Sequence, residues 1–345
     1  MGPSSISRRI ALAFLLLVAF VATASAQQNI QFDVAVTGGA ARISATVHEN
    51  PKAPFGATVL AVHGFTETAA MWEPLAGALF AHPATKFRVK RVIALDLPGH
   101  GNSPIPVLTA PAAFGTLTIY DNVGVLIQAI DILRARGLGP RVVMGHSMGG
   151  LEVQAAQEQL LASGSSLAKK GVFRAILLAA VPVADVDWTP PPSAPLPPAY
   201  IRNDNGTYIV LDAMGALYGG GFSTTASTPA MPVITPAAFA IDFTGLIGGE
   251  PFATAGQLVG SIPELPRPSA RKGAFALRNG TLLTVVGFSE DILTPAAVQP
   301  ALYEHLLGRR GLMYQEIVAP DAVHSMFLTN PKGMLDQLFG FGDSF

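Results

Sequence analysis

From residue 29 onward, short apolar runs alternate along the chain with longer segments in which apolar residues recur every three or four positions. Apolar runs of about four to eight residues predict β-strands, and the longer periodic segments predict amphipathic helices. Strands and helices that alternate in this way are typical of a mostly parallel sheet with helices on both faces. The pattern therefore predicts an α/β fold.

The predicted strands are 30–36, 41–48, 57–62, 91–95, 141–144, 173–180, 281–286 and 313–318. The predicted helices are 69–80, 120–136, 148–161, 295–307 and a closing helix from about 331. Gly38 and Gly39 separate the first two strands, which favours an antiparallel hairpin before the parallel part of the sheet begins.

The alternation stops between residues 182 and 272. Seven prolines fall within 182–198, and glycine clusters follow at 219–221 and 248–249. A structureless loop of this length inside a compact domain is uncommon, so we predict a cap (lid) insertion at 182–272 between core segments 27–181 and 273–345. A disordered insertion is the alternative, but the segment is rich in residues that favour burial. These are Tyr200, Ile201, Tyr208, Leu211, Leu217, Tyr218, Phe239, Phe243, Leu246 and Phe252.

Residues 1–26 differ in composition from the rest of the chain. Arg8 and Arg9 precede the apolar run 10–22, and Ala24-Ser25-Ala26 places small residues at the positions that a signal peptidase reads. We interpret this segment as a signal peptide that is removed on export to the periplasm or the medium. A membrane anchor is the alternative, but the run is shorter than the roughly 20 residues that span a bilayer. The start Ser7-Arg8-Arg9 also resembles a twin-arginine signal without its usual aromatic residue, so the sequence leaves the export route, Sec or Tat, open.

The composition is that of a large globular protein, with 50% hydrophobic and 13% charged residues among 345. Without residues 1–26 the formal charge is about −3, because two arginines and no acid are removed, and no nucleic-acid partner is implied. The absence of cysteine excludes a thiol nucleophile. The seven histidines show no compact metal-ligand spacing, so we expect neither a metal nor a cofactor.

The most informative segment is 141–150, where an apolar run ends in Gly145-His146-Ser147-Met148-Gly149 before a predicted helix. A strand that turns sharply into a helix has room only for very small residues two positions before and after the serine. The turn strains the serine backbone and exposes its hydroxyl, while the helix N-terminus directs N–H groups to the same place. We predict Ser147 as a nucleophile and the Met148 N–H as an oxyanion donor. A glycine-rich turn of an ordinary α/β protein is the alternative.

A serine nucleophile needs a base, and His324 is the predicted one. It lies in the loop after the last predicted strand, which places it at the carboxyl edge of the sheet beside the serine turn. His146 adjoins Ser147 and should point away from it. A second oxyanion donor is expected in the loop after strand 57–62, where we choose the Phe65 N–H and assign His63 a structural role.

The base needs a carboxylate that holds its tautomer, and Asp291, after the strand at 281–286, is our choice. Glu290, its neighbour in sequence, and Asp185 or Asp187, after the preceding strand, are the alternatives that the sequence leaves open. Asp321 is close to His324 in sequence, but we expect it to be a turn residue.

Five motifs in this order resemble the α/β-hydrolase superfamily across nearly all of residues 29–345. They are Val62-His63-Gly64-Phe65, the segment 96–103 (DLPGHGNS), Gly145-His146-Ser147-Met148-Gly149-Gly150, the segment 287–291 (GFSED) and His324. The resemblance implies the triad order Ser147, Asp291, His324 and a structural turn at 96–103. Haloalkane dehalogenases and epoxide hydrolases of this superfamily carry an aspartate in place of Ser147, so both are disfavoured.

The composition of the predicted cap favours one group of serine-bearing relatives. Residues 182–263 contain a single base, Arg202, and six acids, whereas anionic substrates are ordinarily held by Arg or Lys. We therefore expect an esterase, lipase or lactonase that acts on a neutral, fairly apolar small-molecule ester or lactone. A carbon-carbon bond hydrolase, a haloperoxidase or perhydrolase and a hydroxynitrile lyase use the same triad, and a non-catalytic binding protein is a remote alternative. We expect Trp72, Trp188, Tyr200 and Phe222 to line the substrate pocket; the sequence leaves the oligomeric state open.

Overall fold

The protein is described from a computed structural model of the chain. The described residues are 27–65, 67–104, 106–108, 117–187, 200–202, 208–210, 267–289, 291, 294–309, 314–318, 322 and 324–340. The predicted signal peptide and most of the predicted cap lie outside these residues.

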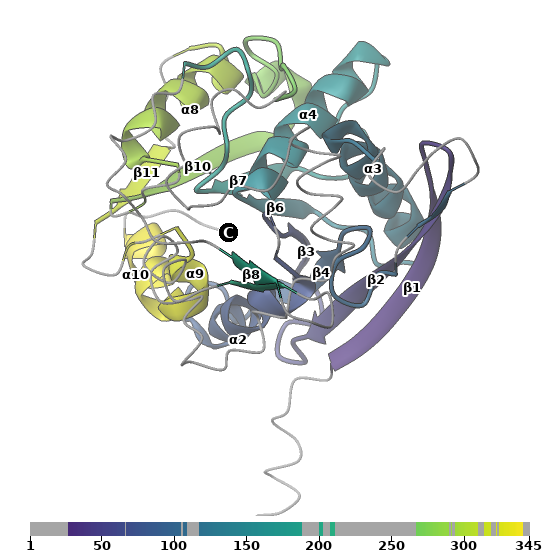
Figure 1. Ribbon diagram of the computed structural model, residues 1–345. Helices are drawn as coiled ribbons and strands as arrows, with labels where there is room; N and C mark the ends of the chain where they lie inside the picture. The colour runs from purple at the N-terminus through teal and green to yellow at the C-terminus, as the bar shows by residue number, and fades with distance from the viewer. Residues whose placement is uncertain are drawn as a thin grey trace, which may run out of the picture.

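A twisted sheet runs through the described part of the chain, in the strand order β1-β2-β4-β3-β6-β7-β10-β11, with β5 paired to β2 (Figure 1). The strands β1 and β2 form an antiparallel hairpin, and β2 is antiparallel to β4. All pairs from β4 to β11 are parallel. The bounds are β1 Gln27–Val36, β2 Gly39–Glu49, β3 Ala57–Val62, β4 Val89–Asp96, β5 Val107–Leu108, β6 Val142–His146, β7 Arg174–Leu178, β10 Leu282–Phe288 and β11 Tyr314–Ile317.

Helices cover both faces of this sheet. One face packs against α3 (Ile119–Ala135), α4 (Met148–Ala162) and α8 (Gln299–Leu307), whose apolar residues share one core cluster. The other face packs against η1 (Ala69–Trp72), α2 (Glu73–Ala81), α9 (Met326–Thr329) and α10 (Pro331–Gly340). Short 3₁₀ turns lie at η4 (Leu277–Asn279) and η5 (Ala296–Val298). The predicted α/β class is confirmed.

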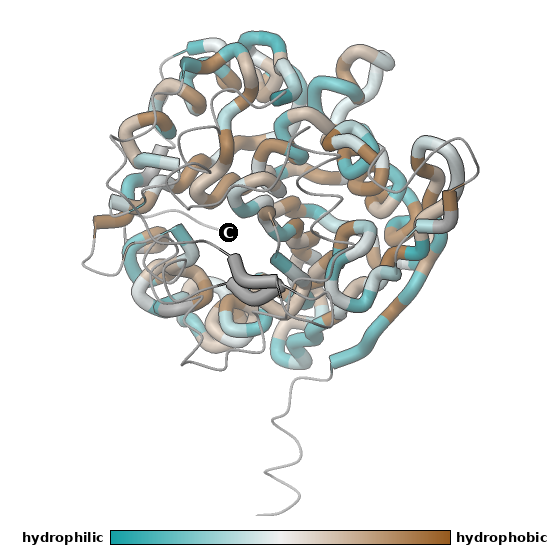
Figure 2. Tube along the Cα trace, viewed as in Figure 1, coloured by the Kyte–Doolittle hydropathy of each residue, from teal (hydrophilic) through white to brown (hydrophobic). Residues whose placement is uncertain are grey.

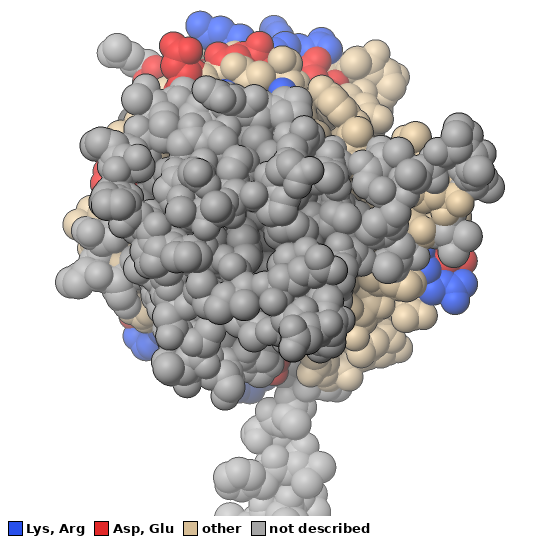
Figure 3. Space-filling view, in the orientation of Figure 1, with Lys and Arg blue, Asp and Glu red and all other residues tan. Residues whose placement is uncertain are grey.

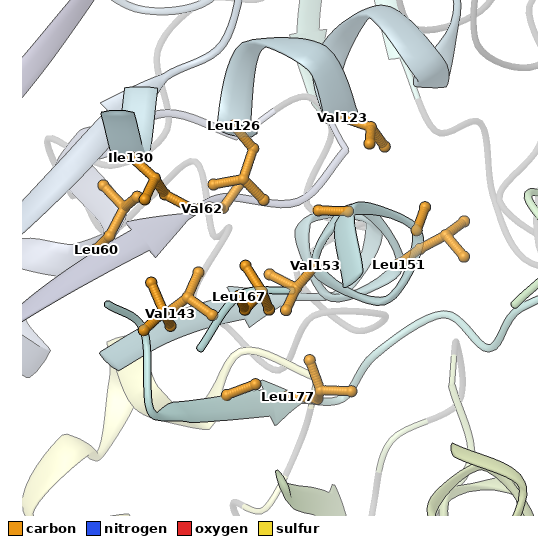
Figure 4. Packing of buried hydrophobic residues seen from close by; sticks show 14 of the residues in the cluster. Leu60, Val62, Val123, Leu126, Ile130, Val143, Leu151, Val153, Leu167 and Leu177 are labelled. Atoms are coloured by element: carbon orange, nitrogen blue, oxygen red, sulfur yellow. The ribbon is translucent and has the colours of Figure 1, made fainter. Parts of the chain in front are cut away.

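The central strands are buried on both sides because successive side chains of a strand point to opposite faces. In β3, Leu60 and Val62 belong to the cluster under α3 and α4, whereas Val59 and Ala61 belong to the cluster on the other face. Leu60 and Val62 lie beside Ile130 and Leu126 of α3 in Figure 4. The hydropathy of the chain follows this layering, with the apolar residues concentrated along the interior strands in Figure 2. This continuous burial holds the carboxyl ends of β3, β6, β7, β10 and β11 in fixed positions.

The predicted helix at 69–80 is divided in the structure into the 3₁₀ turn η1 and the helix α2. Pro74 is the reason, because proline has no N–H to donate to an earlier carbonyl and is accepted at the start of a helix. A second proline, Pro300, begins α8 after η5 in the same way. The short helix α9 and the two-residue strand β5 were not predicted, since each is too short to show a period.

The two ends of the predicted cap lie together in the structure. The Ala184 N–H donates to Pro268 O at 3.0 Å, and the Arg267 guanidinium donates to the carbonyls of Pro182 and Val183 at 2.9 and 3.1 Å. Ends that meet in this way are those of a segment inserted into a core. The antiparallel pair β8 (Tyr200–Arg202) and β9 (Tyr208–Val210) belongs to the segment. Its other residues between 188 and 266 lie outside the described ones, so the cap stays a prediction.

Charged side chains of both signs lie at the periphery of the described surface in Figure 3, with Lys or Arg beside Asp or Glu at the upper edge. Within the described residues, no helix is both long and apolar enough to cross a membrane.

Candidate active site

Ser147 occupies the sharp turn between β6 and α4. Its backbone has φ 51° and ψ −118°, a conformation that residues with a Cβ adopt at a cost of about 1–3 kcal/mol. The surrounding chain holds this strain: the Ser147 N–H donates to Leu178 O at 3.0 Å, and Ser147 O accepts from Gly150 and Val181 N–H at 3.0 and 3.1 Å. The turn therefore has the geometry that the glycine-serine-glycine pattern predicts for a nucleophile.

The two glycines of this motif are required by close approach of the backbone. A Cβ on Gly149 would lie 2.5 Å from His63 O, and one on Gly145 would lie 2.8 Å from the Gly150 Cα. Contacts under 3.0 Å with backbone atoms cannot be relieved by turning a side chain. The glycines thus allow α4 to start directly against the ends of β3 and β6.

Asp291 and His324 are in contact at the same edge of the sheet. Asp291 follows β10, His324 follows β11, and the His324 Nδ1 lies 2.8 Å from Asp291 Oδ2. The two side chains are fully buried. A carboxylate at Nδ1 places the proton on that nitrogen, so Nε2 is the atom that can accept a proton.

Thr294, which no motif in the sequence singled out, fixes the Asp291 carboxylate. The Thr294 N–H donates to Asp291 Oδ1 at 3.0 Å, and its hydroxyl lies 2.7 Å from Oδ2 and 2.8 Å from Ala179 O. A threonine three residues after an aspartate is a common turn arrangement, and this spacing was the only sign of it in the sequence.

The structure separates Asp291 from its rivals among the described residues. Asp185 accepts the Ala270 N–H at 2.9 Å and takes part in the base of the predicted cap. Asp187 is exposed. Glu290 and Asp321 lie outside the described residues. Asp291 is therefore the described carboxylate that contacts His324.

The turn after β3 lies directly against Ser147. A Cβ on Gly64 would stand 2.9 Å from the Ser147 Cβ, so the Gly64 main chain packs directly against the Ser147 side chain. The Gly64 N–H donates to Glu67 Oε2 at 2.5 Å, and the N–H of the next residue, Phe65, is the donor that the sequence predicts for an oxyanion. Met148 opens α4, and the first N–H groups of a helix have no acceptor within the helix. Both predicted oxyanion donors are thus in elements adjoining Ser147.

His63 has the structural role expected from its place in the turn after β3. Its Nε2 accepts the Leu97 N–H at 3.1 Å, so its Nδ1 carries the proton and donates to Gly64 O at 2.8 Å. Burial, and to a lesser degree the neighbouring His100, hold the pKa of His63 well below its ordinary value. The neutral ring ties the turn after β3 to the turn after β4.

The segment 96–103 is a structural turn, as the resemblance implied. Asp96 accepts the N–H groups of Ala69 and Asn102 at 2.7 and 2.9 Å, and the Ser103 hydroxyl donates to Asp96 O at 2.7 Å. Burial raises the pKa of Asp96 despite these donors. This carboxylate therefore supports the turn that packs against His63.

Of the residues expected to line the pocket, Trp72 is the one whose side chain is described. It is 1% exposed and stacks on Phe327 of α9 with ring centroids 4.8 Å apart, so it supports the segment that carries His324. Trp188, Phe222 and the side chain of Tyr200 lie outside the described residues, and the lining roles stay predictions. Among the described residues, no three His, Asp or Glu side chains are grouped so that they could hold a metal ion.

Two curated proteins match part of the chain. The dihydrolipoyllysine-residue acetyltransferase component of the acetoin cleaving system of Pseudomonas putida is 37% identical over 125 residues, which are 35% of this chain and 29% of that protein. Lipase LipV of Mycobacterium tuberculosis is 39% identical over 105 residues, which are 30% of this chain and 33% of the lipase. The matches span a third or less of these relatives.

Solved structures share the fold over most of the chain. An esterase from Thermogutta terrifontis aligns with a TM-score of 0.53 and 18% identity over 91% of this chain and 97% of the esterase. The N-acyl homoserine lactonase AidH aligns with a TM-score of 0.53 and 17% identity over 91% of this chain and 96% of the lactonase. The model of the alpha/beta hydrolase family matches residues 59–337, a range that begins within β3 and ends within α10, and the chain belongs to this family.

Proposed function

We propose that the protein is an exported serine hydrolase that cleaves a neutral, fairly apolar carboxylic ester or lactone. The observation that carries the proposal is the strained Ser147 turn at the sheet edge where Asp291 and His324 are hydrogen-bonded at 2.8 Å. A strained serine beside a carboxylate-oriented imidazole is the arrangement that acyl transfer requires.

In the proposed reaction, the Ser147 hydroxyl attacks the carbonyl carbon of the substrate and its proton passes to His324 Nε2. Asp291 stabilises the resulting imidazolium through Nδ1. The tetrahedral intermediate collapses, the C–O bond to the alcohol breaks, and His324 returns the proton to the departing oxygen. Water then attacks the acyl-enzyme with His324 as base, which releases the acid and restores Ser147.

The N–H groups of Phe65 and Met148 are the proposed donors to the negative oxygen of each intermediate. Phe65 follows Gly64, which lies against Ser147, so its amide belongs to the turn beside the proposed nucleophile. A donor of this kind contributes about 3–4 kcal/mol to the stabilisation of the transition state in comparable sites.

The substrate class rests on composition. Residues 182–263 carry one arginine and six acids, a balance that disfavours acyl-CoA thioesters and other anionic substrates. Several similar proteins are named as an esterase, a lactonase and a lipase. Their names agree with hydrolysis of carboxylic esters and lactones.

A fluorophosphonate probe tests the proposal together with a substrate panel. Wild-type protein should be labelled on Ser147 and should hydrolyse neutral p-nitrophenyl esters or lactones, whereas Ser147→Ala should do neither. A Ser165→Ala variant, which alters a serine three residues beyond the C-terminal end of α4, is the matched control and should behave as wild type. Failure of the folded wild-type protein to react with the probe would overturn the nucleophile assignment. Labelling without turnover of any ester or lactone would redirect the proposal to a lyase or perhydrolase.

Export is a separate part of the proposal, since it rests on residues 1–26 alone. Expression in a Gram-negative host should yield a mature protein that begins at Gln27 and lies in the periplasmic fraction or the medium. Intact-mass measurement of that fraction decides the matter, and a full-length chain retained in the membrane would contradict it.

A further inference from the structure

Glu67 and His146 form a buried pair that the proposed reaction does not use. The His146 Nδ1 lies 2.9 Å from Glu67 Oε2, and the two side chains are 0% and 1% exposed. Glu67 belongs to the turn after β3, and His146 is the last residue of β6, immediately before Ser147. Burial of a charged carboxylate and imidazole costs desolvation free energy, which only well-placed hydrogen bonds offset.

One oxygen of Glu67 joins the pair to the proposed oxyanion turn. Oε2 accepts the Gly64 N–H at 2.5 Å and also faces His146 Nδ1, while Oε1 has no hydrogen-bond partner among the described residues. Glu67 Oε2 therefore orients the Gly64 amide and holds His146 at the same time.

The other nitrogen of His146 joins the pair to the proposed base. Nε2 lies 2.8 Å from His324 O. A carbonyl oxygen only accepts, so Nε2 carries a proton. His146 and Glu67 then share one further proton between Nδ1 and Oε2, and the pair as a whole is neutral wherever that proton lies.

Ring contacts complete the arrangement. The His146 ring lies 4.6 Å from the His324 ring and 4.7 Å from the Phe327 ring, measured between centroids. His146 thus contacts both the main chain and the side chain of the proposed base. A one-ångström displacement of a catalytic group can lower the rate about 100-fold.

We propose that Glu67 and His146 are positioning residues that lock the oxyanion turn and the His324 loop into one rigid unit behind Ser147. The proposal rests on the proposed hydrolytic function for its kinetic consequence, and on the hydrogen bonds alone for its structural one. Neither residue touches the reacting atoms in it. Their effect is transmitted through Gly64 on one side and the His324 carbonyl on the other.

Glu67→Gln tests this proposal because the glutamine side chain has the shape of glutamate but replaces one carboxylate oxygen with an NH₂ group that only donates. The glutamine oxygen can accept from Gly64, but then a neutral His146 cannot donate both to it and to His324 O. The glutamine amide can instead donate to His146 Nδ1, but then it no longer accepts from Gly64. Either arrangement breaks one of the two links.

Kinetics on a neutral ester form the first arm of the test. Glu67→Gln should lower kcat and the rate of fluorophosphonate labelling about 100-fold, with KM changed less than about threefold, and should alter the pH profile of kcat/KM. The matched control is Asp121→Asn, which alters a buried carboxylate in the first turn of α3 that accepts the Thr37 and Thr118 N–H groups at 2.8 and 2.7 Å. This control should lose stability but keep the wild-type rate per folded molecule. A Glu67→Gln enzyme with the wild-type rate and pH profile would overturn the proposal.

Amide hydrogen exchange forms the second arm and does not depend on activity. Glu67→Gln should accelerate exchange in the peptide covering 63–67 or in the one covering 322–328, according to which link is lost, and Asp121→Asn should leave both at the wild-type rate. Wild-type exchange in both segments of Glu67→Gln would overturn the proposed link. If Glu67→Gln does not fold, His146→Gln, which keeps an amide donor for His324 O, serves the same comparisons. Wild-type protein that fails to label would defeat the proposed function, while the exchange result would still decide the link.

Discussion

The main-chain carbonyl of His324 lies 2.8 Å from Nε2 of His146, the residue that precedes Ser147. The proposed base is therefore held at its main chain by the strand that carries the proposed nucleophile, and at its ring by Asp291 at 2.8 Å. Two elements far apart in the chain, β6 and the segment after β10, thus fix one imidazole. Groups that are already in place need little reorganisation when charge develops in a reaction.

The backbone strain at Ser147 gives a test in which two inactive variants differ in stability. Ser147→Ala keeps a Cβ at φ 51°, whereas Ser147→Gly removes it. Glycine is usually about 0.5–1 kcal/mol worse than alanine, but at a positive φ the order reverses. We expect Ser147→Gly to have the higher free energy of unfolding, by about 1 kcal/mol, in urea denaturation. Alanine as the more stable variant would show that the turn is not strained.

Asp291→Asn tests the assignment of the carboxylate. The amide would present N–H groups to His324 Nδ1 and favour the wrong tautomer, so we expect kcat to fall about 10⁴-fold with the fold retained. Thr294→Val, which removes the hydroxyl at 2.7 Å from Asp291 Oδ2, should have a smaller effect in the same direction. The control is Asp187→Asn, at an exposed position, which should be as active as wild type. Full activity in Asp291→Asn would move the role to another carboxylate.

The sequence predicted the parts of the fold that depend on period and on motif. The strand at 57–62 matches β3, because a short, almost entirely apolar run is typical of a strand that is buried on both faces. The turn at Ser147 was predicted from its two glycines, whose small size is a steric necessity that the letters show directly. The contact between Asp291 and His324 followed from the rule that residues after parallel strands meet at one edge of the sheet.

The parts that escaped prediction depend on distant contacts. Glu67 is one acid in a short turn, and its partner His146 is 79 residues away, so no local pattern reveals the pair. The stacking of Trp72 on Phe327 was not predicted either, because a lone tryptophan does not indicate which surface it will meet. The division of 69–80 into η1 and α2 could have been expected from Pro74 alone.

The approach of α4 to the sheet predicts opposite effects for two glycine-to-alanine changes. A Cβ on Gly149 would lie 2.5 Å from His63 O. Gly149→Ala must therefore move α4 and should destabilise the protein by about 3 kcal/mol. Gly77, on the exposed side of α2, has no atom within 4 Å of such a Cβ. Gly77→Ala should therefore stabilise the protein by about 0.5–1 kcal/mol through helix propensity. Thermal unfolding of both variants against wild type measures the difference, and equal melting temperatures would contradict the close approach.

The buried neutral state of His63 predicts how stability depends on pH. Burial first, and then the nearby His100, lower the pKa of His63 in the folded protein well below its ordinary value of 6.5. As pH falls below about 6.5, the unfolded chain takes up a proton at this residue and the folded protein does not, so the free energy of unfolding decreases. Each such histidine contributes a slope of up to about 1.4 kcal/mol per pH unit. His48, whose pKa is also lowered by burial, acts in the same direction.

Urea denaturation at pH 7.5, 6.5 and 5.5 checks this slope. His63→Gln should flatten it, because a glutamine oxygen can accept the Leu97 N–H that His63 Nε2 now accepts at 3.1 Å and takes up no proton. His48→Gln should remove a separate part of the dependence of stability on pH. Asp96 acts in the opposite sense, since its pKa is raised from the ordinary 3.8 and protonation then favours the folded state as pH falls. If the dependence of stability on pH were the same in His63→Gln as in wild type, the His63 ring would have to accept a proton in the folded wild-type protein. That would require the turns after β3 and β4, which the neutral ring connects, to open.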